Sequence, residues 1–145
     1  MNTIHIAIGC DHAGFSTKEV LVGFLNKLGY TVKDFGTYSA DSVDYPDFAH
    51  PVAEAVGSGL CNFGFVICGS GNGVNITANK HKGVRSALCW MPEIASLARL
   101  HNDANVCAIP ARYTSFDEAK EIAQAFLNAN FEGDRHTRRV DKIEG

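Results

Sequence analysis

The stretch Phe63-Gly-Phe-Val-Ile-Cys68-Gly-Ser-Gly-Asn-Gly73 joins a short apolar run to a glycine-rich turn at the start of a predicted helix. The run carries no charged residue, which is typical of a strand buried on both faces of a parallel sheet. The turn can direct several backbone N–H groups at one point, where they and the helix N-terminus favour negative charge. Cys68 therefore stands where a thiolate would be stabilised and could act as base or nucleophile.

Short apolar runs of the same kind recur along the chain, with helical patterns between them. The predicted strands cover residues 4–8, 30–35, 63–68, 84–88 and 106–109. Helices are marked by Leu21, Phe24, Leu25 and Leu28; by Phe48, Val52 and Val56 after Pro46; by a start at Asn72; by Ile94, Leu97, Ala98 and His101; and by Ala119, Ile122, Ala123 and Phe126 behind a Ser115–Glu118 capping box. This alternation predicts an α/β fold, a three-layer doubly wound (Rossmann-like) sandwich with a five-stranded parallel sheet.

The chain has 145 residues and is 46% hydrophobic, which suits one globular domain with one sizeable core. We expect a single domain over residues 1–145, without linkers or internal repeats. The first apolar strand follows the N-terminus without a basic leader region, and no apolar run approaches the roughly 20 residues that cross a bilayer. These features predict a soluble, cytoplasmic protein.

The five cysteines are an odd number and include no Cys-x-x-Cys pair, which argues against a disulfide framework and a thiolate zinc site. We expect Cys10, Cys61, Cys89 and Cys107 to be reduced and to serve as small buried apolar residues. The same role is the alternative for Cys68, but its position at a strand end beside a helix start favours a chemical one.

The net charge of −3 gives no electrostatic sign of binding to nucleic acid or to an anionic membrane. The one basic-looking stretch lies near the C-terminus. Between residues 131 and 145, however, its four arginines and lysines are matched by four acidic residues. We therefore expect neither nucleic acid nor membrane as a partner.

Ligands of doubly wound sheets bind beyond the carboxyl ends of the strands, so the segments 9–14, 36–46, 68–73 and 110–115 are the ones expected to carry chemistry. The glycine pattern of 69–73 lacks the third glycine of a dinucleotide fingerprint and the Gly-Lys-Ser/Thr of a P-loop. What remains is a turn sized for one small anion. A plain strand-to-helix turn without a ligand is the alternative.

Other candidate residues each have a structural alternative. Asp11 and His12 directly follow the first strand, where they could contact a ligand or be an N-cap and an exposed histidine. Tyr45, before Pro46, could equally be part of a helix start. Arg112 lies just past the last strand, as a candidate cation.

The second half of the chain adds further candidates. His101, near the end of its helix, could be a structural histidine favoured by the helix dipole, and Asn102 could belong to a C-terminal turn. Arg135 and Arg139 are spaced i, i+4, so on a helix both guanidinium groups reach the same side and could hold a phosphate. A solvated face with local ion pairs is their alternative.

Taken together, these residues resemble the B-type ribose-5-phosphate isomerases, within the wider family that includes galactose-6-phosphate isomerase subunits. The likeness covers essentially the full length. Its landmarks are GCDHAG (9–14), DYP (44–46), CGSGNG (68–73), ANK (78–80), HNDAN (101–105) and GDRHTRR (133–139).

The resemblance implies a role for each matching residue. Cys68 matches the base that moves a proton between C1 and C2 through an enediolate, and Val74 stands where a second group of the family carries glutamate. Ser70 and the N–H groups of residues 71–74 match the enediolate-binding turn. The remaining matches are Asp11 and Tyr45 near the sugar hydroxyls, His101 in ring opening, Asn102 beside the sugar, His12, Arg112, Arg135 and Arg139 at the phosphate, and Gly69, Gly71, Asn72 and Gly73 in the turn.

The resemblance also implies a homodimer or tetramer whose active site is shared between subunits. It implies no cofactor, and the sequence shows no convincing metal cluster. The expected substrate pair is D-ribose 5-phosphate and D-ribulose 5-phosphate. Two alternatives stay open: isomerisation of a six-carbon sugar phosphate such as allose or galactose 6-phosphate, and a noncatalytic module that binds a phosphorylated ligand.

Overall fold

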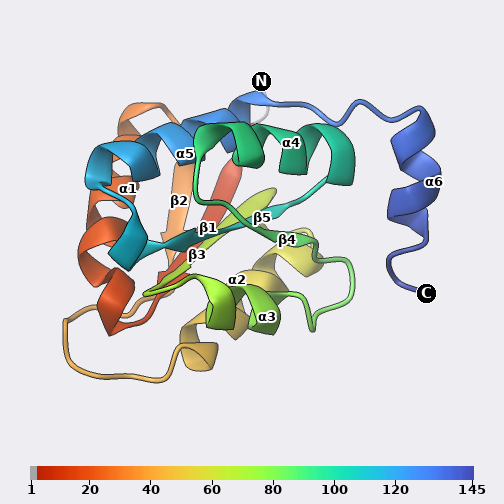
Figure 1. The fold of residues 1–145 in the computed structure, drawn as a ribbon. Helices are drawn as coiled ribbons and strands as arrows, with labels where there is room; N and C mark the ends of the chain where they lie inside the picture. Colours follow the sequence, from red (N-terminus) through yellow and green to blue (C-terminus); the bar gives the residue numbers. More distant parts are fainter. Residues whose placement is uncertain (1–2) are drawn as a thin grey trace.

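The computed structural model describes residues 3–145 and places five parallel strands in one sheet, in the order β2-β1-β3-β5-β4 (Figure 1). The strands are β1 (His5–Cys10), β2 (Thr31–Asp34), β3 (Phe63–Cys68), β4 (Ser86–Leu88) and β5 (Val106–Pro110). This arrangement confirms the predicted α/β sandwich. β1 runs two residues further than expected because its ladder with β3 continues to the pair Cys10 and Ile67.

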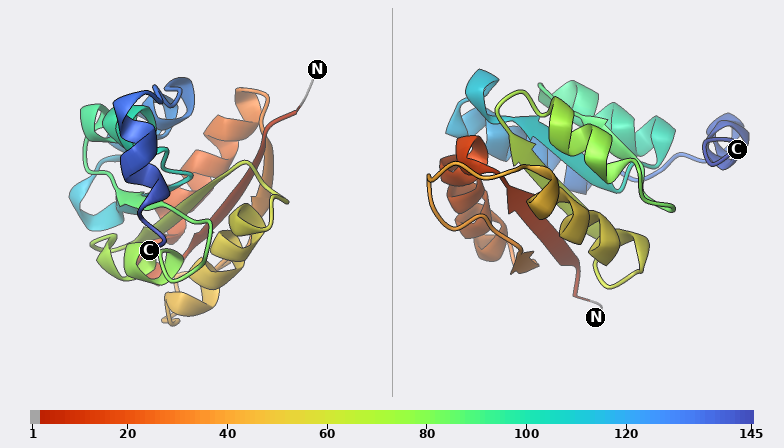
Figure 2. Two further views of the ribbon diagram at one scale, coloured as in Figure 1. Left: turned by 90° about the vertical axis from the view of Figure 1, so that its right-hand side faces the viewer. Right: turned by 90° about the horizontal axis from the view of Figure 1, so that it is seen from below.

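Among the described residues, five helices cover the two faces of this sheet (Figure 2). They are α1 (Phe15–Lys27), α2 (Pro46–Gly57), α3 (Asn72–Ala78), α4 (Pro92–Asn102) and α5 (Phe116–Asn128). The chain also forms another helix, α6 (Arg135–Asp141), and the short 3-10 helices η1 (His12–Gly14) and η2 (Ala111–Tyr113). The predicted helix starts at Pro46 and Asn72 are confirmed, as is the capping box of Ser115 and Glu118.

Alternation along β3 divides the core into two layers. Phe65 and Ile67 pack with α1, α4 and α5, whereas Val66 and Cys68 pack with α2 and α3. Cys68 thus ends the strand on the side where α3 begins. The central strand both fills the core and carries the thiol to the sheet edge.

The buried face of α4 differs from the prediction. Ala95 and Ala98 are buried against α5, while Ile94 and Leu97 are only half-buried. Small residues allow the close approach of the two helices, and this turns the larger apolar side chains partly outward. Burial of Val52 and Val56 on α2 agrees with the prediction.

Buried thiols should make the fold sensitive to alkali. Burial raises the pKa of the Cys10 thiol from 9.0 to about 12, and burial also raises the pKa of Cys61 and Cys107. Above pH 9 the unfolded chain loses these protons while the folded chain keeps them, so stability is complete below pH 9 and declines toward pH 12. We expect Cys10 alone to reduce the free energy of unfolding by about 1.4 kcal/mol at pH 10.

Urea unfolding between pH 7 and pH 10 tests this prediction. Cys10→Ala should flatten the decline, because the alanine variant has no proton to lose at that position. An equally steep decline in wild type and variant would contradict it.

Candidate active site

A cavity of about 340 Å³ opens at the carboxyl edge of the sheet, where β1, β3 and β5 end. It brings together residues from four separate segments. They are Asp11, His12, Ala13, Tyr45, Cys68, Gly69, Ser70, Gly73, Arg112 and Tyr113. Seven of the residues that the sequence singled out as candidates therefore meet around Cys68: Asp11, His12, Tyr45, Gly69, Ser70, Gly73 and Arg112. Ala13 and Tyr113 carried no sequence signal.

The turn after Cys68 needs its glycines. Gly71 has a φ of +77°, and a Cβ there would lie 2.5 Å from Leu88 Cδ1. A Cβ on Gly73 would lie 2.6 Å from the Tyr45 ring. The backbone of the turn can therefore pack closely against Leu88 and Tyr45. The N–H groups in the first turn of α3 have no partner within the helix. Ser70 Oγ accepts one of them, from Asn72, at 3.2 Å.

Asp11 is held by the backbone it caps. Its Oδ1 accepts hydrogen bonds from the N–H groups of Ala13 at 3.0 Å and Gly14 at 3.2 Å. The N-cap interpretation is thus correct, and it fixes the carboxylate at the cavity wall. Asp11 is only 7% exposed, so the second carboxylate oxygen is available at a defined position.

His12 and Arg112 supply the cavity with donors. His12 Nδ1 accepts a hydrogen bond from the Val43 N–H at 3.2 Å, so the neutral ring carries its proton on Nε2. The Arg112 backbone N–H donates to the carbonyl of Gly69 at 3.0 Å, which ties η2 to the glycine turn. A donor and a permanent cation therefore stand beside Cys68, as an anionic ligand requires.

The other predicted residues lie at the opposite edge of the sheet. His101 and Asn102 end α4, and the chain then enters β5 at Val106, whereas Cys68 pairs with Pro110 at the far end of β5. The length of this strand alone separates the two edges by about 13 Å. Here a second cavity of about 360 Å³ is lined by His101, Asn102, His136, Arg139, Val140 and Ile143. One chain therefore does not bring its own His101 to its own Cys68.

The arginine pair lies on α6, which stands apart from the two helical layers (Figures 1 and 2). His136 is the one buried residue of α6, and its ring stacks on His101 with centroids 4.3 Å apart. Arg135, Arg138 and Arg139 are exposed. The predicted i, i+4 arrangement of Arg135 and Arg139 is thus present. Both residues lie on the C-terminal arm, which we define as residues 129–145 and which is at the opposite edge of the sheet from the Cys68 cavity.

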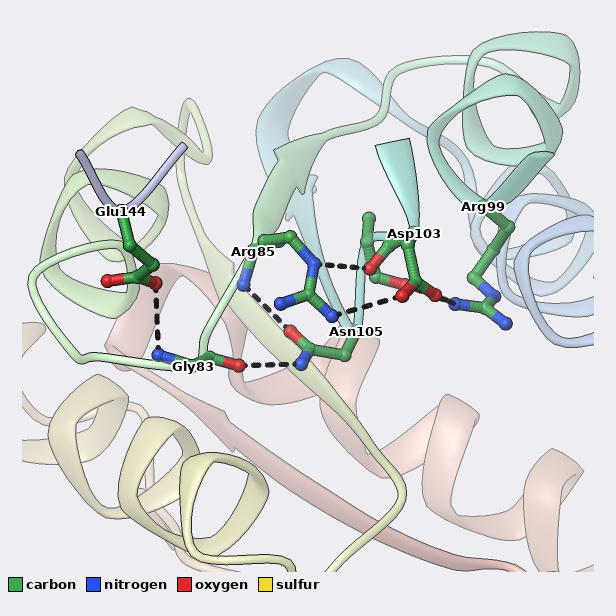
Figure 3. Close-up of polar contacts among 7 residues, drawn as sticks. Gly83, Arg85, Arg99, Asp103, Asn105 and Glu144 are labelled. Atoms are coloured by element: carbon green, nitrogen blue, oxygen red, sulfur yellow. Dashed lines mark hydrogen bonds and ion pairs between the residues drawn. The ribbon is translucent and has the colours of Figure 1, made fainter. Parts of the chain in front are cut away.

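An ion-pair network holds the turn after His101 (Figure 3). Asp103 ends α4 in the left-handed conformation, with a φ of +48°. Its carboxylate pairs with Arg99 at 3.1 Å and with Arg85 at 3.3 Å, and its carbonyl accepts from Arg85 Nε at 2.7 Å. Glu144, near the C-terminus, accepts from the Gly83 N–H at 3.1 Å. Nothing in the sequence indicated these ion pairs.

Removing the charge of Asp103 should destabilise this turn. Asn tolerates the left-handed backbone, so Asp103→Asn keeps the turn but removes the charge and one of the two acceptor oxygens, and it should lower the free energy of unfolding by about 1–2 kcal/mol. Asp103→Ala also strains the backbone and should cost about 1 kcal/mol more. Urea unfolding of the two variants checks the order. Wild-type stability in both would contradict the network's role.

Glu132 and His136 were not among the residues that the sequence singled out as functional. Glu132 Oε1 lies 3.5 Å from His101 Nε2 and 3.4 Å from His136 Nε2. Burial and the neighbouring Arg135 lower the pKa of His136. The i, i+4 spacing of Glu132 and His136 was a weak signal, but contact with His101 depends on how α6 packs.

No helix within residues 3–145 is long and apolar enough to span a membrane.

Known proteins have similar sequences and the same fold. The family model described as Ribose/Galactose Isomerase matches residues 6–143. Ribose-5-phosphate isomerase B of Escherichia coli is 46% identical over 95% of this chain and 93% of its own length. The solved ribose-5-phosphate isomerase B of Clostridium thermocellum superposes with a TM-score of 0.95 at 49% identity, covering 97% of this chain and 95% of that one.

A second solved relative carries a ligand. Ribose-5-phosphate isomerase B of Mycoplasma genitalium, with bound ribulose-5-phosphate, superposes with a TM-score of 0.95 at 41% identity, over 99% of this chain and 95% of that one. The family match and the relatives both extend across both cavities and α6. The chain belongs to the ribose/galactose isomerase family.

Proposed function

We propose that the protein interconverts D-ribose 5-phosphate and D-ribulose 5-phosphate through an enediolate, with Cys68 as the base. The observation that carries the proposal is the position of Cys68. It ends β3 at the head of the glycine turn, in one cavity with Asp11 and His12. Relatives named ribose-5-phosphate isomerase B, and one solved with ribulose-5-phosphate, support the choice of substrate.

The cavity suits the chemistry of aldose–ketose isomerisation. The Cys68 thiolate removes the proton from C2 of the open-chain aldose, and the resulting thiol returns it to C1, while the hydroxyl proton on O2 passes to O1 and leaves the carbonyl at C2. Negative charge builds on the substrate oxygen in between. The N–H groups of residues 71–74 and the Ser70 hydroxyl are the donors for that oxygen. Asp11 and Tyr45 contact the sugar hydroxyls from the cavity wall.

The phosphate clamp is completed by a second subunit. His12 and Arg112 lie at the Cys68 cavity, whereas Arg135, Arg139, Asn102 and His101 lie at the opposite edge of the same chain. A homodimer or tetramer in which the arm of one subunit reaches the Cys68 cavity of the other would unite the two sets. The exposure of α6 supports this assembly.

We further propose that residues 1–145 work as one isomerase domain with α6 as its arginine-bearing arm. All five cysteines are free, which suits a reducing compartment and supports a cytoplasmic location. Backbone and side-chain donors polarise the substrate in this mechanism, so it requires no cofactor.

Turnover of five- and six-carbon sugar phosphates tests the substrate. The family description includes galactose as well as ribose, so allose and galactose 6-phosphate are the comparison substrates. We expect kcat/KM for ribose 5-phosphate to exceed that for either by at least ~10-fold, because one extra carbon in a binding site is typically discriminated by about that factor or more. A preference for a six-carbon substrate would overturn this assignment.

Proton exchange separates an isomerase from a binding module. In heavy water, the wild type should exchange the C2 proton of bound ribose 5-phosphate, and Cys68→Ala should not. Binding without exchange in the wild type would identify a noncatalytic module.

A further inference from the structure

Three metal-ligating side chains meet at the amino edge of the sheet. His101, Glu132 and His136 each offer one ligand atom, and the three atoms lie within 4.8 Å of one another. His101 lies in the last turn of α4, Glu132 lies in the segment between α5 and α6, and His136 lies in the first turn of α6. The cluster therefore joins the arm to the body of the protein.

His136 is an independent sign of a ligand. It is 7% exposed, and its Nε2 atom is fully buried and has no hydrogen-bond partner among the described residues. The nearest acceptor, Glu132 Oε1, is 3.4 Å away. Leaving a buried polar nitrogen unpaired is costly, so an atom that engaged Nε2 would be stabilised there.

The spacing suits a tetrahedral metal ion. With metal–ligand bonds of about 2.1 Å, neighbouring ligand atoms of a tetrahedron stand about 3.4 Å apart. The two Glu132–histidine distances are 3.4 and 3.5 Å. The His101 side chain is 37% exposed and can turn to bring its lone pair to the same centre.

The donor set also selects the kind of metal. Two imidazoles and one carboxylate suit Zn²⁺ and its neighbours, whereas Mg²⁺ and Ca²⁺ require mostly oxygen ligands. Arg139 lines the same cavity and repels cations bound by charge alone.

We propose that His101, Glu132 and His136 form a binding site for a divalent transition-metal ion of the Zn²⁺ type. Three protein ligands leave a fourth position open, beside Arg139, for water or an anion. A consequence rests on the proposed function: a metal on His101 withdraws that imidazole from ring opening, so occupancy inhibits the isomerase. Binding itself does not depend on the function.

Titration of the whole protein with Zn²⁺ by calorimetry, without substrate, tests the site. We expect one ion per chain at neutral pH, and an affinity at least ~10-fold weaker in Glu132→Gln and in His136→Asn. The matched control is His81→Asn. It breaks the other close histidine pair, His50 and His81, whose ring nitrogens are 2.7 Å apart, and it should bind as the wild type does.

Co²⁺ spectra identify the ligands. Absorption of a tetrahedral nitrogen–oxygen site supports the proposal, whereas thiolate-to-cobalt charge transfer would place the metal on Cys68 and overturn it. Absence of binding in the wild type, or equal affinity in Glu132→Gln and His81→Asn, would also overturn it. Zinc binding without inhibition would leave the site standing and contradict the ring-opening role of His101 instead.

Discussion

Replacing Cys68 with alanine is expected to reduce turnover of ribose 5-phosphate by at least ~10³-fold. The thiol is the one side chain at the head of the glycine turn that can take and return a proton on carbon. Asp11 lies in the same cavity, but two backbone N–H groups hold its Oδ1, and the proposed mechanism gives its other oxygen to the sugar hydroxyls. The N–H donors of residues 71–74 remain in the variant, so sugar phosphate should still bind with little change in affinity.

Cys61→Ala is the matched control. Cys61 and Cys68 are 4% and 5% exposed and pack in the same layer of the core, but Cys61 precedes β3 and Cys68 ends it. Each substitution removes one buried sulfur and should cost similar stability, about 1 kcal/mol. Only Cys68→Ala should lose turnover. Substantial activity in Cys68→Ala, or equal loss in both variants, would contradict the assignment of the base.

The sequence predicted the fold, and which candidate residues would lie together around Cys68, for a physical reason. β3, the thiol and the glycine turn are contiguous, so local signals describe them completely. Asp11 and Arg112 could be added because parallel strands share one carboxyl edge. The meeting of these residues around Cys68 depends on topology alone, and the alternation of strands and helices predicted that topology.

The positions of the other candidate residues could not be predicted from the sequence. His101 precedes β5, and chain order alone places it at the amino edge, whereas its part in the same active site as Cys68 was implied only by the family resemblance. The half-buried Ile94 and Leu97 show the same difficulty, because the face that α4 buries depends on its contact with α5. The stacking of His136 on His101 depends on the path of the arm, for which residues 129–134 carry no strong local signal.

The proposed division of one chain into two half-sites can be tested by mixing two variants. Cys68→Ala and His101→Asn homo-oligomers should each be nearly inactive, since every active site lacks one of the two groups. When the two variants assemble together, a mixed dimer holds one site with both groups intact and one site with neither. Random assembly makes half of the dimers mixed, so activity should recover to about one quarter of the wild type.

A second mixture provides the control. Cys68 and Arg112 line the same cavity of one chain, so a mixed dimer of Cys68→Ala and Arg112→Ala still has one defect in each site. This pair should show no recovery beyond the activity of Arg112→Ala itself. Equal recovery in both mixtures would mean that subunits correct each other's folding. Native mass spectrometry verifies that mixed dimers have formed. If they have formed and the first mixture shows no recovery, His101 serves a site other than the partner's. If only the first mixture recovers activity, His101 of one subunit must complete the Cys68 cavity of the other.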